Sequence, residues 1–214
     1  EPAAAESAGT TLVAAPWCAA AKSVLALSDD TAAGEAVFYA LTAVMHAPTW
    51  LAKQPSEMDD FPEVPLPGDA TALAQAVDLG RRIAALTDPT VPVAGVTTGA
   101  ISPALSSLAI ADPVAGTVPL AYGAHGRRGG LRVESDVLWD ADAGWRNLPE
   151  GVWNYIACGF PVLPKWLSYR VNTGLRPTDR QEFMLIARRI AALLDLQDEC
   201  DAVHAAAVDL PLEQ

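Results

Sequence analysis

The chain has 214 residues, of which 51% are hydrophobic, so it can bury one sizeable core or at most two small lobes. Its formal net charge of −12 at pH 7 argues against a generic binder of polyanions. No apolar run approaches the roughly eighteen residues that a membrane span needs, so we expect no contact with a membrane.

The first thirty residues are an alanine-rich lead-in. This lead-in lacks the basic region followed by an apolar run that marks a secretory signal. It allows a short strand at Thr11–Ala14, and we expect it to be the junction to an upstream domain of a longer protein. Three cysteines without zinc-ligand spacing lie at Cys18, Cys158 and Cys200. We therefore expect reduced thiols, in a cytoplasmic protein with no metal site.

Two helices are predicted next. From Asp30 apolar residues surround the predicted helix almost completely, and Pro48 ends it. His46, near that end, is expected to cap or pack. Residues 54–68 cannot form a helix, because their prolines remove donors and favour extended backbone. Asp69 caps the second helix, whose apolar stripe consists of Leu73, Ala76, Val77, Gly80, Ile83, Ala84 and Leu86.

Short β-prone runs separated by glycine, proline and aspartate then predict a small, mostly antiparallel β region. A long helix is predicted from Thr178, which forms a capping-box pattern with Gln181. The fold class expected is therefore α+β, with the β region packed against several helices. We expect a single domain over residues 31–208, made of a helical part (31–88), the β region (91–156) and closing helices (161–208).

The cations are concentrated in one third of the chain. Residues 123–190 hold 10 basic and 7 acidic residues, whereas residues 1–122 hold 4 and 13, and residues 191–214 hold none and 6. Two polar loops, 123–130 and 171–180, contain several of the arginines. A face that binds phosphates requires such a concentration. Pairing of these arginines with neighbouring carboxylates is an equally good interpretation.

The densest group of large side chains is Val152–Arg170, which includes two tryptophans, two tyrosines and two cations. Aromatic side chains bury much apolar area, so we expect this stretch to fix a core and to leave Asn154, Lys165 and Arg170 facing outward. The residues expected to join the β region to the closing helix are Trp153, Tyr155, Val162, Leu163, Trp166 and Leu167.

Two blocks of the sequence resemble the type ISP restriction-modification enzymes. The first is FYALTAVMHAPTWLAKQPSEMDDFPEVPLPGD, followed by a helix ending in RRIAAL. The second block consists of Val152-Trp153-Asn154-Tyr155, Gly159-Phe160-Pro161-Val162-Leu163 and Trp166-Leu167-Ser168-Tyr169-Arg170. The blocks occur in the family's order and, with the closing helix, cover roughly residues 30–197.

The resemblance implies a C-terminal target-recognition domain that follows an adenine-N6 DNA methyltransferase domain. Double-stranded DNA and that upstream domain would be its partners, and S-adenosylmethionine would be the cofactor of the parent enzyme. This chain has no glycine-rich S-adenosylmethionine loop, Asn-Pro-Pro-aromatic motif, Walker A motif or nuclease signature. We therefore expect it to recognise DNA and to hold no catalytic residue or cofactor.

Arginine, lysine, asparagine and threonine contact phosphates, and arginine and asparagine also read base edges. The residues expected to contact DNA are Arg127, Arg128, Arg132, Arg146, Asn154, Lys165, Arg170, Asn172, Thr173, Arg176 and Arg180. Each of them has an alternative interpretation as an ordinary surface charge, and the net charge predicts weak, salt-sensitive binding by this chain alone.

Two other functions stay open. A protein-interaction module of a larger phage-defence complex, without direct DNA readout, would suit the acidic composition. A stand-alone enzyme would need a nucleophile and an acid beside His46, His125 or His204, and no GxSxG elbow is present.

Overall fold

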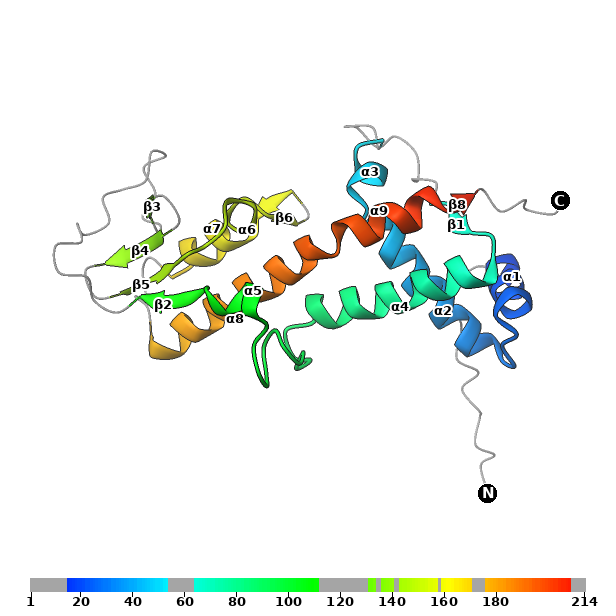
Figure 1. Cartoon of the computed structure of the whole chain (residues 1–214), viewed down its shortest axis with the longest axis horizontal. Helices are drawn as coiled ribbons and strands as arrows, with labels where there is room; N and C mark the ends of the chain where they lie inside the picture. The colour runs from blue at the N-terminus through cyan, green and yellow to red at the C-terminus, as the bar shows by residue number, and fades with distance from the viewer. Residues whose placement is uncertain are drawn as a thin grey trace, which may run out of the picture. The chain divides into compact units, whose positions relative to one another are not determined.

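The structure, a computed structural model, describes residues 15–53, 64–111, 131–133, 136–140, 143–157, 159–170 and 176–208. Contacts between Cα atoms group the chain into two compact units. Unit 1 comprises Glu1–Ala84 and Leu196–Gln214, and unit 2 comprises Ala85–Asp195. The expected helical part therefore lies mostly in unit 1, and the expected β region lies in unit 2 (Figure 1).

Unit 1 consists of helices and one small antiparallel sheet. Its elements are α1 (Ala15–Leu25), α2 (Asp30–Met45), α3 (Pro48–Leu51), β1 (Leu66–Pro67), most of α4 (Ala70–Thr87), α9 (Gln197–Ala205) and β8 (Ala207–Val208). α1 packs against α2, and α9 contacts α2 and α3. β1 pairs with β8, so that Leu66 lies opposite Val208. No helix in the described ranges is long and apolar enough to cross a bilayer.

The alanine-rich lead-in contains a helix that the sequence analysis did not predict. Cys18 and Ala21 of α1 are buried. Alanine has the highest helix propensity, and its small side chain lets α1 pack closely on α2. The strand expected at Thr11–Ala14 lies outside the described residues.

Aspartates cap two of the helices of unit 1. The Asp29 carboxylate accepts a hydrogen bond of 2.8 Å from the amide three residues ahead, and Asp69, as predicted, accepts one of 2.9 Å in the same way. Pro48 was expected to end the first helix. Instead α2 ends at Met45, and Pro48 occupies the first turn of α3, where its missing N–H is not needed.

At Gly80 the backbone of α4 approaches the backbone of α2 closely. A Cβ added to Gly80 would lie 1.8 Å from the carbonyl oxygen of Tyr39, far inside van der Waals contact. The predicted apolar stripe of α4 is confirmed, because every member is buried except Ala84, which is half-buried. The sequence thus placed Gly80 on the inner face, and the structure explains why only a residue without a side chain fits there.

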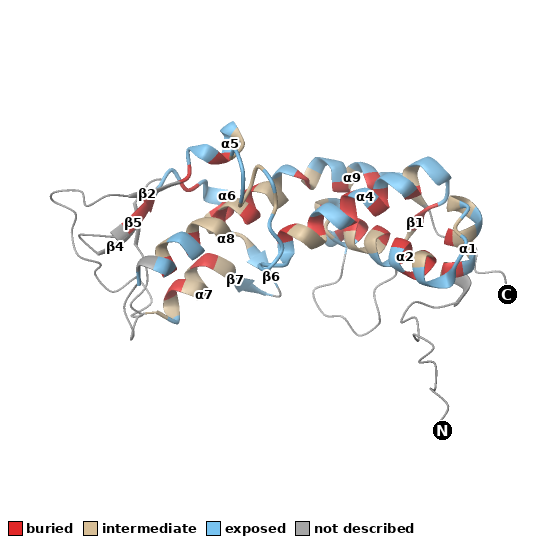
Figure 2. Ribbon diagram, turned by 90° about the horizontal axis from the view of Figure 1, so that it is seen from below, coloured by how far each residue is buried: buried red, intermediate tan, exposed pale blue. Residues whose placement is uncertain are grey.

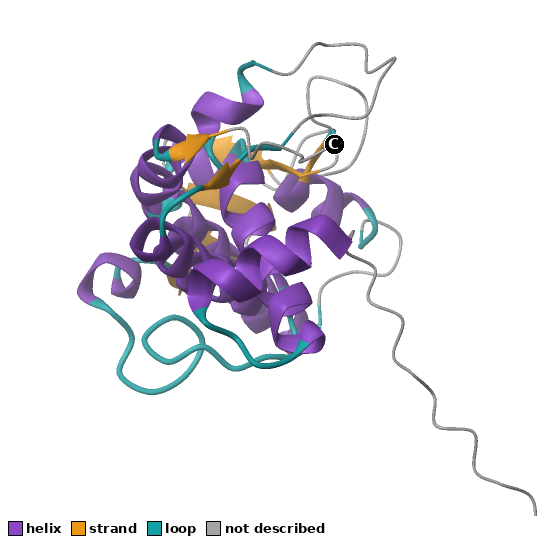
Figure 3. Ribbon diagram, turned by 90° about the vertical axis from the view of Figure 1, so that its right-hand side faces the viewer, coloured by secondary structure: helices purple, strands orange, loops and turns teal. Residues whose placement is uncertain are grey.

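Unit 2 contains a four-stranded sheet, a hairpin and four helices within its described part. The elements are α5 (Pro103–Ser106), β2 (Ala109–Ala111), β3 (Leu131–Val133), β4 (Asp136–Asp140), β5 (Ala143–Arg146), α6 (Glu150–Trp153), β6 (Ile156–Ala157), β7 (Phe160–Pro161), α7 (Val162–Ser168) and α8 (Pro177–Asp195). The sheet has the order β2-β5-β4-β3 with all neighbours antiparallel, and α8 contacts β2 and β5. The predicted α+β fold, with a mostly antiparallel β region against helices, is confirmed (Figure 3).

The β-prone residues 91–102 form turns, not a strand. One isolated bridge joins Ala94 and Thr98, and Gly95 and Gly99 have φ values of +78° and +70°. These left-handed conformations favour glycine and interrupt extended backbone. In this segment the turn residues therefore outweigh the β propensity of its valines and threonines.

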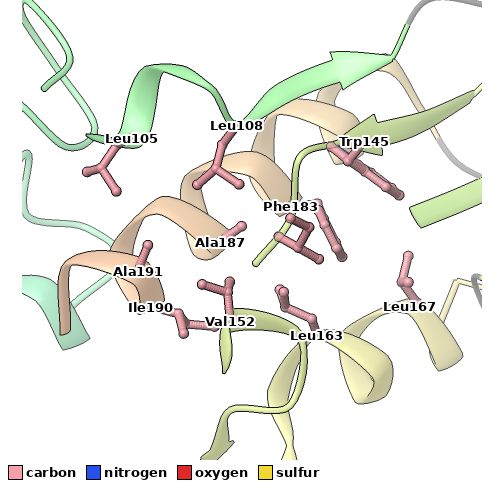
Figure 4. Close-up of a cluster of buried hydrophobic side chains, with 11 residues drawn as sticks. Leu105, Leu108, Trp145, Val152, Leu163, Leu167, Phe183, Ala187, Ile190 and Ala191 are labelled. Atoms are coloured by element: carbon pink, nitrogen blue, oxygen red, sulfur yellow. The ribbon is translucent and has the colours of Figure 1, made fainter. Parts of the chain in front are cut away.

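The core of unit 2 lies between α8, the sheet and the segment of α6 and α7 (Figure 4). Trp145 is 2% exposed, and its ring stacks on Phe183 with the centroids 3.9 Å apart. Trp166 meets the same phenylalanine edge-on at 5.5 Å. Leu163 and Leu167 are fully buried, as predicted. The other four residues expected in this core, Trp153, Tyr155, Val162 and Trp166, are partly buried and pack against it.

Trp145→Ala should lower the free energy of unfolding by about 3–5 kcal/mol, the usual cost of deleting a buried aromatic side chain. It also leaves the Arg180 carbonyl without the indole N–H that donates to it at 2.9 Å. Trp166→Ala should cost less, because Trp166 is half-buried. Urea unfolding followed by circular dichroism gives the free energy of unfolding of both variants. A larger loss of stability for Trp166→Ala than for Trp145→Ala would contradict the central position of Trp145 in the core.

Gly80→Ala should lower the melting temperature, although alanine is normally about 1 kcal/mol better than glycine inside a helix. The reason is the collision with Tyr39. Gly151→Ala is the matched control, since a Cβ there meets only the Leu194 Cδ1 at 3.4 Å. A melting temperature for Gly80→Ala at or above the wild-type value, in thermal unfolding by circular dichroism, would contradict the close approach of α2 and α4.

Candidate nucleic-acid interface

The net charge of the chain lies in unit 1. Unit 1 holds 4 basic and 16 acidic residues, a net of −12, and unit 2 holds 10 of each, a net of zero. Since phosphates are repelled by uncompensated carboxylates, unit 2 is the part of the chain that a polyanion can approach. All eleven residues expected to contact DNA belong to unit 2.

Asp179 binds two of the predicted arginines at the start of α8. Its carboxylate accepts a hydrogen bond from the Arg176 amide at 2.8 Å and two from the Arg176 guanidinium at 3.0 and 3.2 Å. The Arg170 Nε lies 3.4 Å from the same carboxylate, and the Asp179 side chain is only 2% exposed. One buried carboxylate therefore compensates charge on both arginines.

The start of α8 differs from the predicted capping box. The helix begins at Pro177, and Asp179 bonds back to the amide of the residue before that proline. This is the return half of a capping box, with aspartate in the place usually taken by glutamate or glutamine. The box predicted at Thr178 and Gln181 therefore lies two residues earlier, at Arg176 and Asp179.

Arg170 is held on three sides. Its guanidinium lies 3.3 Å from the centre of the Trp166 ring, donates to the Trp166 carbonyl and contacts Glu182 at 3.2 Å. Its side chain is 19% exposed. These contacts hold the Arg170 side chain half-buried within unit 2. That Arg170 contacts DNA stays a prediction.

Two arginines outside the predicted set are structural. The Arg189 guanidinium is buried and donates to the carbonyls of Ala85, Leu86 and Val91, and Arg188 donates to the Leu108 carbonyl. They explain part of the concentration of cations in residues 123–190. Both arginines therefore bind backbone carbonyls of their own unit and not a ligand.

The exposed members of the predicted set are spread over several elements. Arg146 ends β5 opposite Ala109 and is exposed. Asn154 is exposed at the end of α6, and the Arg176 side chain is 75% exposed despite its pairing. Arg180 is half-buried, and its carbonyl accepts the indole N–H of the core tryptophan.

Five of the predicted contacts fall on residues whose side chains the structure does not describe. Arg127, Arg128, Asn172 and Thr173 lie outside the described residues, and Arg132 lies on β3, of which the backbone alone is described. The contacts expected of these five residues stay predictions.

Lys165, on α7, has aromatic neighbours that the sequence analysis did not assign to binding. Its ammonium lies 5.3 Å from the ring centres of Phe160 and Tyr169. Both rings are largely exposed, at 57% and 69%. The Gly159-Phe160-Pro161 break was a signal in the sequence, since glycine and proline mark turns.

A polar cluster in unit 1 bears on the enzyme hypothesis. Thr49 Oγ1 lies 2.7 Å from both Asp201 Oδ1 and His204 Nδ1, beside a cavity of about 940 Å³. An ionised carboxylate accepts only, so Thr49 donates to Asp201 and the Nδ1–H of His204 donates to Thr49. Burial lowers the pKa of His204. The histidine is a donor to the hydroxyl, not its base, and the cluster joins α3 to α9.

Among the side chains that the structure describes, no group of three histidine, cysteine, aspartate or glutamate residues could hold a metal ion. The buried thiol of Cys200 is not activated either, because burial raises its pKa to about 11. A low thiol pKa is the usual mark of a reactive cysteine.

Asp179→Asn should test the arginine pairing through its pH dependence. Hydrogen bonds from Arg176 and then Arg170 hold the pKa of Asp179 well below its usual range. Such a group stabilises the fold above its unfolded pKa of about 3.9, and the stabilisation is lost as the pH falls. Asp179→Asn should therefore melt below the wild type at pH 7, with the difference shrinking below about pH 4. A difference that stays constant over this range would show that the charge of Asp179 is not what stabilises the fold.

The sequence model of one protein family, described as the Type ISP C-terminal specificity domain, matches residues 16–183. No curated protein matches the chain. A solved structure of a nuclease-deletion mutant of the Type ISP restriction-modification enzyme LlaGI, in complex with a DNA substrate mimic, is similar with a TM-score of 0.49 and 14% identity. The match covers 77% of this chain and 13% of the LlaGI chain. Because the family match covers most of its length, this chain belongs to the Type ISP C-terminal specificity domain family.

Proposed function

We propose that this chain is the DNA sequence-recognition module of a restriction-modification enzyme. The observation that carries the proposal is the family match over residues 16–183. The distribution of charge supports it, because the predicted contacts belong to the unit without excess negative charge. The module itself performs no chemistry.

In this proposal an adenine-N6 methyltransferase domain, part of the same polypeptide, binds S-adenosylmethionine and performs the methylation. The chain positions double-stranded DNA for that domain, in the cytoplasm and as part of a defence against phage. Its own contribution is to set register through phosphate contacts and to select sequence through base edges.

The side-chain contacts divide the predicted DNA-binding residues into two groups. Arg170 and Arg176 are paired with Asp179, and Arg170 also with Glu182, so two carboxylates compensate the two guanidinium charges within the fold. Arg146 and Asn154 are exposed, and Lys165 has aromatic neighbours. We assign DNA contact first to these three residues and to the arginines of residues 123–130, and a positioning role to Arg170.

The alternative, a protein-interaction module, is favoured by one observation, the net charge of −12 in unit 1. An acidic helical unit suits a basic protein surface better than DNA. The two proposals are compatible if unit 2 meets DNA and unit 1 meets another domain of the same enzyme.

Replacing Arg127 and Arg128 together by alanine in the polypeptide that contains this chain should abolish or relax site-specific methylation without unfolding the domain. Loss of bidentate arginine contacts to guanine costs roughly 1–3 kcal/mol of discrimination for each base pair. Long-read sequencing of host DNA gives the methylated sites of wild type and variant. The control is Arg81→Ala with Arg82→Ala, a second adjacent pair, located on the exposed side of α4 in unit 1.

Methylation at unchanged sites by the Arg127 and Arg128 variant would remove residues 123–130 from the recognition surface. If the wild-type polypeptide methylated no DNA and this chain bound no duplex even at low salt, the proposed function would be wrong.

A further inference from the structure

The hairpin of β6 and β7 and the adjoining α7 carry a group of side chains with two exposed rings, which we call the aromatic patch. It consists of the rings of Phe160 and Tyr169 and of the half-buried Lys165, whose ammonium lies near both rings. Phe160 and Tyr169 are 57% and 69% exposed. Figure 2 shows β6 and β7 in the colour of exposed residues. Large exposed apolar side chains gathered around a cation indicate a contact surface.

The backbone beneath the patch is fixed by the core. Leu163 and Leu167, on the inner side of α7, are fully buried in the cluster around Phe183. The hairpin closes through Gly159, whose φ of +77° favours glycine, and the Val162 amide donates to the Tyr155 carbonyl at 3.0 Å. The patch is therefore presented by a buried helix and a closed turn, which keeps its side chains in register.

Lys165 differs from Arg170 and Arg176 in having no ion pair with any carboxylate that the structure describes. Arg170 faces Asp179 and Glu182, whereas no carboxylate of a described side chain makes an ion pair with Lys165. Its neighbours are the faces of two rings, which attract the cation but do not neutralise it. The charge of Lys165 is thus available to an anion that reaches the patch.

We propose that the aromatic patch contacts DNA, with Lys165 bound to a phosphate and the rings of Phe160 and Tyr169 against a base or deoxyribose. This inference rests on the proposed function. It adds the aromatic residues Phe160 and Tyr169, which hydrogen bonding to phosphates or base edges does not use. The ligand must offer negative charge and apolar surface together, which DNA does through its phosphates and deoxyribose rings and, where a base is unstacked, through the face of that base. The zero net charge of unit 2 permits its approach.

The patch can be tested by measuring duplex binding of this chain as a function of salt. The probe is a fluorescein-labelled duplex of mixed sequence, followed by anisotropy from low to physiological salt. Lys165→Ala should reduce the slope of log K against log salt by about 0.9, the value for one phosphate contact. Phe160→Ala and Tyr169→Ala should each weaken binding by about 5-fold or more, with the slope unchanged, because a stacked ring carries no charge.

Matched controls come from unit 1. Phe38 is 56% exposed and Lys53 is exposed, so Phe38→Ala and Lys53→Ala make the same chemical changes at residues outside the patch. They should leave both the affinity and the slope at the wild-type values. Circular dichroism of every variant verifies that the fold is intact. Heparin is a polyanion without bases. It should bind Lys165→Ala more weakly than the wild type and should bind the Phe160→Ala and Tyr169→Ala variants as tightly as the wild type.

Three results would overturn the assignment. Wild-type affinity and slope in all three patch variants would remove the patch from the DNA interface while leaving the proposed function in place. If the patch variants bound DNA like the wild type but no longer associated with the rest of the polypeptide, the patch would be a protein contact. Absence of duplex binding by the wild type at every salt concentration would reject both the patch and the proposed function.

Discussion

Unit 2 is assembled around the ring of Phe183, at which the sheet, α7 and α8 meet. Trp145 from β5 stacks on this ring, and Trp166 from α7 meets it edge-on. One turn earlier on α8, Asp179 holds Arg170, which covers the face of Trp166. The apolar core and the ionic cluster therefore share one tryptophan, which contacts Phe183 and also carries Arg170 over its ring.

This arrangement divides the cations of unit 2 by function. The buried carboxylate of Asp179 and the backbone carbonyls around Arg189 take up arginine charge inside the fold. An internal arginine with several acceptors fixes the elements that it joins, because its planar group has donors in set directions. Lys165, which lacks such acceptors among the described side chains, is free to serve a surface. A count of basic residues along the sequence does not distinguish the arginines that are bound inside the fold from the lysine that faces a ligand.

The sequence predicted the parts of the fold that depend on local patterns. The apolar stripe of α4 and the Asp69 cap follow from spacing, and the buried leucines of α7 follow from aromatic density. The pairing of Trp145 with Phe183 was not predictable, because it joins residues 38 positions apart through a sheet whose register the sequence does not specify. The helix α1 was missed because alanine-rich sequence gives no amphipathic pattern.

The candidate site was predictable to a similar extent. Residue type identified Lys165, but its ring neighbours come from the hairpin and from the residue after α7, so the grouping exists only in three dimensions. Pairing of Arg170 and Arg176 with one aspartate likewise required the start of α8 to be placed correctly. The sequence predicted which residue types could bind DNA. It did not predict which of their charges are compensated by carboxylates on other elements.

The uneven charge of the two units has a kinetic consequence. A long-range field acts before any contact forms, and it favours those encounters in which like charges stay apart. Unit 1 carries the whole excess of twelve negative charges, so a polyanion that diffuses toward the chain is repelled from unit 1 and meets unit 2 more often. Even without adding affinity, the acidic unit thus acts as a filter on collision orientation, and its effect fades as salt shortens the range of the field.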